Sequence, residues 1–479
     1  MALRYAGPAV QRLCRARVLR SQTLPLAFVR RGIALTLCMT LARVILAQQS
    51  PPDTPGDTPA AGASADAQQY AIHGQATFLE QLTAPFHAPY AGTNSLTPRQ
   101  GAENSDLTLF LGARLWSGAE AWINPEIDQG FGLDDTLGVA GFPSGTAYKV
   151  GRSHPYWRLP RLFLRQTIDL GGERQAVDAD ANQLAGVQSA NRWVLTVGKF
   201  AVTDIFDGNQ YSHDPRVDFL NWAAIDAGTF DYAADSWGFT VGAAAEWYQG
   251  AWTVRAGVFD LSNVPNNETL DPNVHEFQGI GEVEHRHELM GLPGKVLVTV
   301  FDSYGRMAEL NDAVSLAQTT GESVGAALVD VRAYRNRTGV SLSLEQRLSP
   351  DLGMFVRAGK ADGNVEAYEF SDIDRTIAAG LSLNGKGWSR PQDTAGLALI
   401  DDGISATRQR YLNAGGLGIL VGDGQLPHPG AEQILETYYR WVPARWLQLT
   451  LDYQYVVNPA YNSDRGPVSI AAFRFHAQF

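Results

Sequence analysis

Apolar and polar residues alternate one by one along many stretches of the chain, and this pattern restricts the fold more than any other feature. In the segment 447–455 every odd position is Leu or Tyr, whereas the even positions are Gln, Thr and Asp. Successive side chains of a β-strand point to opposite faces, so such a segment forms a strand with one apolar and one polar face. The segments 107–115, 162–170 and 340–347 repeat the pattern. We therefore predict an all-β protein.

Soluble antiparallel sheets show the same alternation as membrane β-barrels. The length and the ends of the alternating segments therefore decide between a soluble sheet and a membrane barrel. Many segments have ten residues or more, which exceeds the usual strand of about 5–6 residues and matches the 9–11 that cross a bilayer. Only 18% of the residues are charged, and a mean hydropathy of −0.16 argues against a helical membrane bundle. The ends of the segments carry Trp, as in the aromatic girdles of outer-membrane barrels, at Trp116, Trp193, Trp247, Trp252, Trp441 and Trp446.

Short and long connections alternate along the chain, as expected for an outer-membrane barrel with short periplasmic turns and long extracellular loops. The short turns lie at 117–119, 249–250, 350–351 and 443–445, and the long connections at 84–103, 131–157, 201–235, 305–336 and 403–430. The connection 171–191 departs from this rule. We predict a transmembrane antiparallel β-barrel of about 16 strands, at 70–83, 104–116, 120–130, 158–170, 192–200, 236–248, 251–259, 276–288, 295–304, 337–348, 353–361, 374–384, 393–402, 431–441, 446–457 and 467–479.

The residues before the barrel are typical of an export signal and a linker. Arg30 and Arg31 precede an apolar run, and a small residue, Ala47, offers a cleavage site, so we predict a secretory signal peptide at 1–47. A membrane anchor needs about 20 apolar residues, and Arg43 interrupts the run. Residues 48–69 are rich in Pro and Ala and are expected to form a flexible linker before a barrel at 70–479.

Removal of the signal peptide would change the composition of the chain in two ways. Both cysteines lie in the first 47 residues, so the mature chain would have neither disulfides nor Cys-ligated metals. The same segment holds eight Arg and no acidic residue, so the formal net charge would move from −12 to −20. Nucleic acid is therefore excluded as a partner, since it requires a positive surface.

The final strand ends in an alternating row of apolar residues, Ala471, Phe473, Phe475, Ala477 and Phe479. A lipid-facing strand has this pattern. It also resembles the C-terminal signature of bacterial outer-membrane proteins, whose assembly machinery recognises a terminal aromatic residue. We expect the strand that ends at Phe479 to bind that machinery.

The polar faces of the predicted strands carry nearly equal numbers of Arg and carboxylates, which suits neither a phosphate pore nor a cation pore. Arg and acid groups hydrogen-bond hydroxyls, and aromatic faces stack on sugar rings, so we expect a neutral, hydroxyl-rich solute. Alternatively, the opposite charges pair across the wall and set a transverse field. The predicted channel-lining and sugar-binding residues are Arg114, Glu120, Trp122, Glu126, Asp128, Arg161, Arg165, Arg255, Arg357, Glu436 and Arg440.

The sequence lacks the catalytic motifs of hydrolases, P-loop proteins and dinucleotide-binding enzymes. The acidic and amide residues of 204–221 do not have EF-hand spacing and are expected to form a structured outer loop over the mouth of the barrel. His285, His287 and Glu288 lack a zinc motif. We predict no catalytic residues, no metal site and no cofactor.

Several motifs resemble the carbohydrate-selective porins of the OprB type. They are GKFAVTDIFDGNQY at 198–211, DPR at 214–216, FLNW at 219–222, FDYAADSWG at 230–238 and YQYVVNPAYNSDRGPV at 453–468. The resemblance covers most of 70–479. It implies a sixteen-stranded barrel of the bacterial outer membrane with an arginine-lined constriction that passes monosaccharides such as glucose by diffusion.

We therefore expect a porin that admits small carbohydrates to the periplasm, with small sugars and outer-membrane lipid as its partners. A porin of broader selectivity, a barrel for polysaccharide export and, less favoured, an outer-membrane enzyme are the alternatives. The sequence is compatible with a monomer and with a homotrimer.

Overall fold

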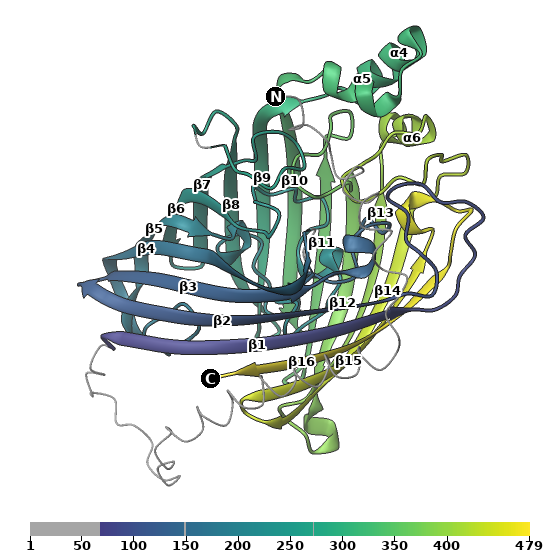
Figure 1. The fold of residues 1–479 in the computed structure, drawn as a ribbon. Coiled ribbons are helices and arrows are strands. Elements are labelled where there is room, and N and C mark those ends of the chain that lie inside the picture. The colour runs from purple at the N-terminus through teal and green to yellow at the C-terminus, as the bar shows by residue number, and fades with distance from the viewer. Residues whose placement is uncertain (1–67, 148–149, 272) are drawn as a thin grey trace. The chain divides into compact units, whose positions relative to one another are not determined.

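The computed structural model describes residues 68–147, 150–271 and 273–479. In this part of the chain sixteen antiparallel strands pair in chain order, and β1 pairs with β16 to close a barrel (Figure 1). The predicted fold class is confirmed. The strands are β1 Tyr70–Thr83, β2 Gly101–Trp116, β3 Ala119–Gly130, β4 Arg152–Val177, β5 Gly186–Phe200, β6 Thr240–Gln249, β7 Trp252–Asp260, β8 Phe277–Leu289, β9 Leu292–Met307, β10 Ala333–Arg347, β11 Leu352–Ala361, β12 Arg375–Asn384, β13 Thr394–Gly403, β14 Glu432–Ala444, β15 Leu447–Val457 and β16 Val468–Gln478.

The two faces of the wall differ as the alternation requires. Along β15, Leu451 is 67% exposed on the outer face, whereas its neighbours Thr450 and Asp452 are buried on the inner face. Large apolar side chains such as Val258 and Leu399 are exposed in the same way on other strands. Such a belt is stable against lipid, and the closed ring leaves no strand edge unpaired.

The C-terminal residue completes the closure of the ring. The Phe479 amide donates to the Gly74 carbonyl oxygen at 3.0 Å, and the Gly74 amide donates to the Phe479 carbonyl oxygen at 3.1 Å. A Cβ atom at position 74 would collide with the Phe479 ring, so glycine allows the ring to lie over β1.

The connections differ strongly in length at the two ends of the barrel. Helices α4 (Leu310–Thr320), α5 (Val324–Asp330) and α6 (Ala406–Asn413) gather at the end with the long loops (Figure 1). No helix in the described residues has the length and apolar character needed to cross a membrane. At the other end, β4 and β5 continue far beyond their neighbours. Most of the predicted connection 171–191 is therefore strand.

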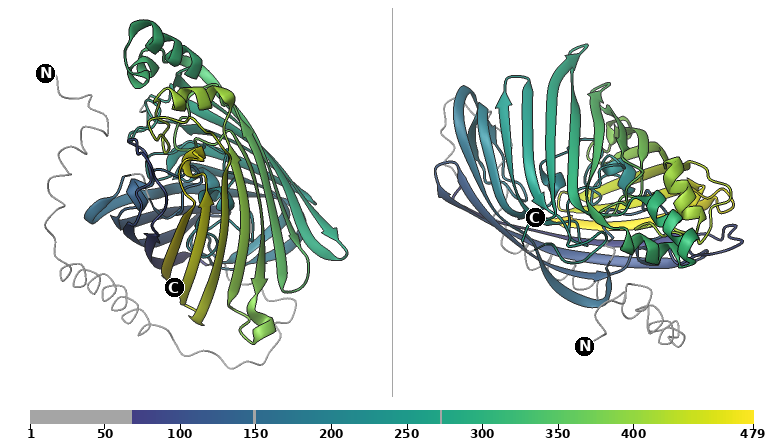
Figure 2. Two further views of the ribbon diagram at one scale, coloured as in Figure 1. Left: turned by 90° about the vertical axis from the view of Figure 1, so that its right-hand side faces the viewer. Right: turned by 90° about the horizontal axis from the view of Figure 1, so that it is seen from above.

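The short helices η1 (Leu133–Asp135), η2 (Val202–Asp204), α3 (Trp222–Ile225), η3 (Gly385–Trp388) and η4 (Pro459–Tyr461) lie in the connections. Loop segments occupy part of the space within the ring of strands (Figure 2). The largest is the β5–β6 connection, residues 201–239, here called the inner loop. Its residues Phe219, Trp222 and Phe230 are buried in the main apolar cluster of the structure.

The predicted signal peptide at 1–47 and residues 48–67 of the predicted linker lie outside the described residues. At the start of the described chain, the Gln68 amide donates to the Ala185 carbonyl oxygen at 3.1 Å, next to the β4–β5 hairpin.

Candidate functional site

Buried charged side chains of the wall bind the inner loop. Arg357 of β11 donates to the carbonyl oxygens of Ser212 at 2.8 Å, Ala224 at 2.6 Å and Asp207 at 3.0 Å. Its Nε lies 3.5 Å from the Asp207 carboxylate, and both side chains are 0% exposed. One arginine therefore joins three points of the loop to the barrel wall.

Carboxylates on three other strands accept hydrogen bonds from the loop backbone. Glu436 of β14 accepts from the Leu220 amide at 2.5 Å, and Glu282 of β8 accepts from the Asp207 amide at 2.8 Å. Glu345 of β10 accepts from the Gln210 amide at 2.7 Å. The inner loop is thus fixed within the lumen rather than over the mouth, where the sequence analysis had placed 204–221. That prediction overlooked these wall carboxylates, which satisfy the backbone donors of the loop.

A second loop, 362–374, packs against the inner loop through Asp231. The Asp231 carboxylate accepts hydrogen bonds from the amides of Tyr368, Phe370 and Ser371 at 2.7, 2.9 and 3.0 Å. It also pairs with Arg337 of β10 at 3.0 Å, with neither side chain exposed. Both loops are therefore held by buried networks of hydrogen bonds and ion pairs.

A cavity of about 150 Å³ lies between the inner loop and the wall at β4. Its lining combines charged and aromatic side chains. The charged and titratable groups are Arg161, His213, Arg216, Asp226 and Asp235, and the aromatic rings are Phe142, Trp222, Tyr232, Trp237, Phe239 and Phe370.

The guanidinium groups at the cavity are held by acids and rings. Arg161 pairs with both oxygens of Asp204, at 2.7 and 2.6 Å. Its guanidinium carbon lies 4.9 Å from the centre of the Phe239 ring. Arg158, which does not line the cavity itself, has its guanidinium carbon 5.4 Å from the ring centre of the lining residue Trp237. These contacts fix planar N–H donors in defined directions.

His213 adds a further positive charge to the cavity. Its Nδ1 lies 3.3 Å from Asp226, and its Nε2 lies 3.1 Å from the Thr203 carbonyl oxygen. Burial opposes the charged form, but the hydrogen bond and charge of Asp226 outweigh it and raise the pKa of His213 to about 9. The imidazole is therefore charged at neutral pH, and its Nε2 donates to the Thr203 carbonyl oxygen.

The aromatic side chains form a rigid group beside these charges. The rings of Phe142 and Trp222 stack at 5.3 Å with an interplanar angle of 9°. Phe370 meets Trp222 edge-on at 4.8 Å and Tyr232 at 4.7 Å. Such packing holds the rings in place and leaves an apolar surface beside directional donors, the usual composition of a small-molecule site.

The eleven residues predicted to line the channel all lie on the inner face of the wall. Of these, only Arg161 lines the cavity. Arg357 and Glu436 hold the inner loop, and Arg440 donates to the Val217 carbonyl oxygen in the same loop at 3.2 Å. Arg255 forms ion pairs within the wall to Glu246, Glu282 and Glu284 at 3.1, 2.7 and 3.0 Å.

Three of the predicted residues lie where the β4–β5 hairpin folds back. Arg165 donates to the Asn182 carbonyl oxygen at 2.8 Å, and Arg114 donates to the Ala185 carbonyl oxygen at 3.3 Å. Glu120 lies 3.6 Å from Arg114 and 3.9 Å from Arg165.

The last three predicted residues pair with their neighbours in the wall. Trp122 donates to Glu120 at 3.2 Å. Glu126 and Asp128 both pair with Arg158. Most of the eleven predicted residues therefore bind other residues of the barrel wall, which is the alternative that the sequence analysis left open.

The sequence analysis did not predict four residues that lie at or beside the cavity: Arg158, His213, Arg216 and Trp237. Arg158 was not predicted to point inward because the β3–β4 register shifts between Asn124 and Glu126, and counting by alternate positions fails across such a bulge. The other three lie on the inner loop, where alternation says nothing. The family motifs at 214–216 and 230–238 were the only available signal for Arg216 and Trp237.

Comparisons with known proteins agree with this architecture. The model of the carbohydrate-selective porins, OprB family, matches residues 93–479. The high-pH structure of Pseudomonas putida OprB is similar with a TM-score of 0.64 and 15% identity, over 86% of this chain and 94% of that chain. The low-pH structure of the same protein has a TM-score of 0.45 and 12% identity, over 86% of this chain and 93% of that chain. Salmonella typhi OmpF, in complex with daunomycin, gives 0.45 and 8%, over 86% and 98%.

No curated protein matches the chain. The family model nevertheless spans most of its length, and the closed barrel has the fold of the high-pH structure of Pseudomonas putida OprB. The chain belongs to the OprB family of carbohydrate-selective porins, the channels of the bacterial outer membrane.

Proposed function

We propose that the protein passes monosaccharides such as glucose by diffusion into the periplasm and that the cavity beside the inner loop contacts them. The observation that carries this proposal is the pairing of fixed guanidinium donors with aromatic rings, seen at Arg161 and Phe239. Sugar hydroxyls accept hydrogen bonds from such donors, while the apolar face of the sugar ring packs on the aromatic surface. Contacts of this kind are weak and reversible, as transport requires.

The charges around the cavity also favour a neutral solute. Arg161 is offset by Asp204, and His213 by Asp226. An ionic solute would have to compete with these internal pairs, whereas a hydroxyl group uses the remaining N–H donors and carboxylate oxygens. Selectivity by shape and hydrogen bonding is therefore favoured over selectivity by charge.

Single-channel recording in planar bilayers tests the assignment. Glucose should block the ion current of the parent protein in a concentration-dependent manner. Trp237→Ala should weaken the block about fivefold, since an aromatic contact contributes about 1 kcal/mol. Arg161→Gln should weaken it further. Lys386→Gln, which removes an exposed positive charge at the β12–β13 turn, is the matched control and should behave as the parent.

A liposome-swelling series separates the remaining candidates. Swelling with monosaccharides but not with amino acids of similar size supports the proposal. Equal rates for both would indicate a porin of broader selectivity, and entry of long oligosaccharides would indicate an export barrel. The proposal includes no covalent step and no catalytic residue. The absence of glucose block in the parent would refute the substrate assignment and leave the barrel unaffected.

Two proposals about partners accompany this function. β16, which ends next to Phe479, is proposed to bind the outer-membrane assembly machinery, and the barrel is proposed to form a homotrimer. Native mass spectrometry in detergent tests the second, and a single monomer peak would contradict it.

A further inference from the structure

The hairpin of β4 and β5 extends beyond the rest of the wall at the end with the short turns, which faces the periplasm in outer-membrane barrels. The pairing of β4 with β3 ends at Gln166, and the pairing of β5 with β6 ends at Arg192. Residues 167–191 are here called the periplasmic hairpin. Within the described part of the chain, its two strands pair only with each other. Its length is therefore not needed to close the barrel.

The periplasmic hairpin bends where it leaves the wall. The β4–β5 register shifts between Asp169 and Gly171 and again between Gly171 and Arg174. Gly171 and Gly172 have φ angles of +92° and +91°, which residues with a side chain rarely adopt. Such irregularities bend a strand, so the hairpin turns away from the line of β4.

The tip of the hairpin, residues 178–185, returns to the wall. Arg165 of β4 donates to the Asn182 carbonyl oxygen at 2.8 Å. A straight strand from Arg165 to Val177 would be about 40 Å long, so this contact requires the hairpin to fold back onto the barrel.

Two further segments of the wall hold the tip. Arg114 of β2 donates to the Ala185 carbonyl oxygen at 3.3 Å, and its Nε donates to the Gln68 carbonyl oxygen at 3.0 Å. The Ala185 amide donates to the Oε1 of Gln68 at 2.8 Å. The tip therefore reaches from β4 to the start of β1.

The tip covers the inner side of the wall. Leu184 is 2% exposed and belongs to the main apolar cluster, together with the inward residues Ala71 of β1 and Trp122 of β3. On the outer side at the same end of the barrel, Tyr70 and Leu115 are 76% and 51% exposed. Because the outer side is bare here, the tip lies across the periplasmic opening of the lumen.

The body of the hairpin differs from its tip in exposure. Residues 168–176 are all exposed, whereas residues 181–186 are buried or half-buried. The body thus makes few contacts of its own and serves to carry the tip back to the opening.

We propose that the tip of the periplasmic hairpin is a lid that narrows the exit of the lumen and so limits the size of the solutes that pass. Arg114, Arg165 and Leu184 are the positioning residues that hold the lid in place. The lid acts in series with the cavity beside the inner loop. Its role in sugar passage rests on the proposed function, but a narrowed exit restricts any solute, including ions and neutral polymers.

A shortened variant removes the lid and keeps the wall. Replacement of residues 170–191 by Asn-Gly connects Asp169 to Arg192, its partner in the ladder, through a two-residue turn. The single-channel conductance of this variant in planar bilayers should rise at least twofold. A polyethylene glycol that the parent excludes, added to one chamber at a time, should lower the conductance of the variant from one side only, because only the periplasmic opening has widened.

Leu184→Asp tests the contact of the tip at full chain length. It places a charge in the apolar cluster, so it should release the tip and give the same one-sided response to the polymer. Val187→Asp, at a position that is 40% exposed in the same hairpin, is the matched control and should behave as the parent. Heat-dependent mobility on gels checks the fold of each variant, and the shortened variant decides the test if Leu184→Asp does not fold.

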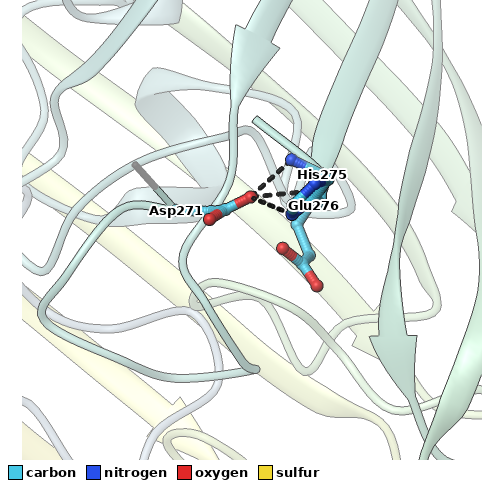
Figure 3. A group of neighbouring side chains, drawn as sticks. All are labelled: Asp271, His275 and Glu276. Atoms are coloured by element: carbon cyan, nitrogen blue, oxygen red, sulfur yellow. Dashed lines mark hydrogen bonds and ion pairs between the residues drawn. The ribbon is translucent and has the colours of Figure 1, made fainter. Parts of the chain in front are cut away.

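A second control loosens a connection at the opposite end of the barrel. In the β7–β8 connection, the Asp271 carboxylate accepts hydrogen bonds from the amides of His275 and Glu276 (Figure 3). Asp271→Asn weakens these bonds and should leave the response to the polymer unchanged.

Three results would overturn the lid. The first is a shortened variant with the conductance and polymer exclusion of the parent. The second is a folded Leu184→Asp that excludes the polymer as the parent does, and the third is a one-sided response in Val187→Asp or Asp271→Asn, since any altered connection would then produce it.

The polymer experiment contains no sugar, so its failure is distinct from that of the proposed function. Absence of glucose block in the parent would refute the proposed substrate alone. Glucose block in the parent, with unchanged polymer exclusion in the shortened variant, would refute the lid alone.

Discussion

Arg357 is the residue at which a single change should release the inner loop. In Arg357→Met, three carbonyl groups lose a buried donor, and Asp207 is left as a buried carboxylate without its cation. Breaking a buried ion pair by removing one partner costs about 3–5 kcal/mol. The free energy that docks the loop would fall by that amount, which corresponds to a factor of about 10² to more than 10³ in the docking equilibrium.

The barrel itself should survive this change. Its strands are joined by backbone hydrogen bonds that do not involve the Arg357 side chain, and Glu436 and Glu345 still hold other points of the loop. We therefore expect a folded barrel with a larger and noisier single-channel conductance and a weaker glucose block.

Recording in planar bilayers measures both quantities. The control is Arg375→Gln, which removes an exposed arginine that lies 4.0 Å from Asp401. An exposed pair of this kind contributes about 0–1 kcal/mol, so the control should match the parent. A conductance, noise level and glucose block in Arg357→Met equal to those of the parent would refute the assignment of Arg357 as the main attachment of the loop.

Three further predictions follow from the structure. Because the pKa of His213 is raised to about 9, the cavity loses a positive charge as the pH rises through that value. The anion preference of the channel, measured from reversal potentials between pH 7.5 and 10, should therefore fall in the parent and stay constant in His213→Gln. Because this pKa lies above the ordinary value of about 6.5, the stability that His213 contributes is complete below the ordinary value and is lost as the pH rises through about 9. The thermal midpoint of the parent should therefore fall more than that of His213→Gln between pH 7.5 and 10, and an equal fall in both would contradict this. Leu451→Arg places a charge on the outer face and should lower the free energy of unfolding from lipid vesicles by about 2–4 kcal/mol if the position lies near the midplane, and no loss would show that lipid does not contact this face. Phe479→Ala should reduce the amount of heat-modifiable barrel recovered from outer membranes, and normal recovery would argue against recognition of the terminal ring.

The strands could be predicted because their signal is local. Lipid on one side and a polar interior on the other impose a two-residue period, and this period identifies the inward residues without knowledge of their partners. It fails where the register changes. Pro125 and Pro160 lie at the β3–β4 irregularity, where a residue without an amide hydrogen cannot continue the ladder, and Arg158 there turns inward out of phase.

The cavity could not be predicted in the same way because its contacts are long-range. Arg357 and the Asp207 carbonyl oxygen that it binds are 150 positions apart, and Leu220 and Glu436 are 216 apart. Alternation says that Arg357 points inward, but it does not say whether a solute or another part of the chain meets it there. The inward arginines were therefore identified correctly as inward, while their partners had to come from the structure.

The attachment of the inner loop to β8, β10, β11 and β14 has a consequence for biogenesis. These strands are spread around the ring, so the groups that bind the loop come together around it only once the ring of strands has formed. A barrel whose inner loop has not yet docked would be a wide, unselective pore. Discrimination between solutes is thus the final property that the molecule acquires, and slow docking of one segment would expose the cell to leakage even when every strand is correctly paired.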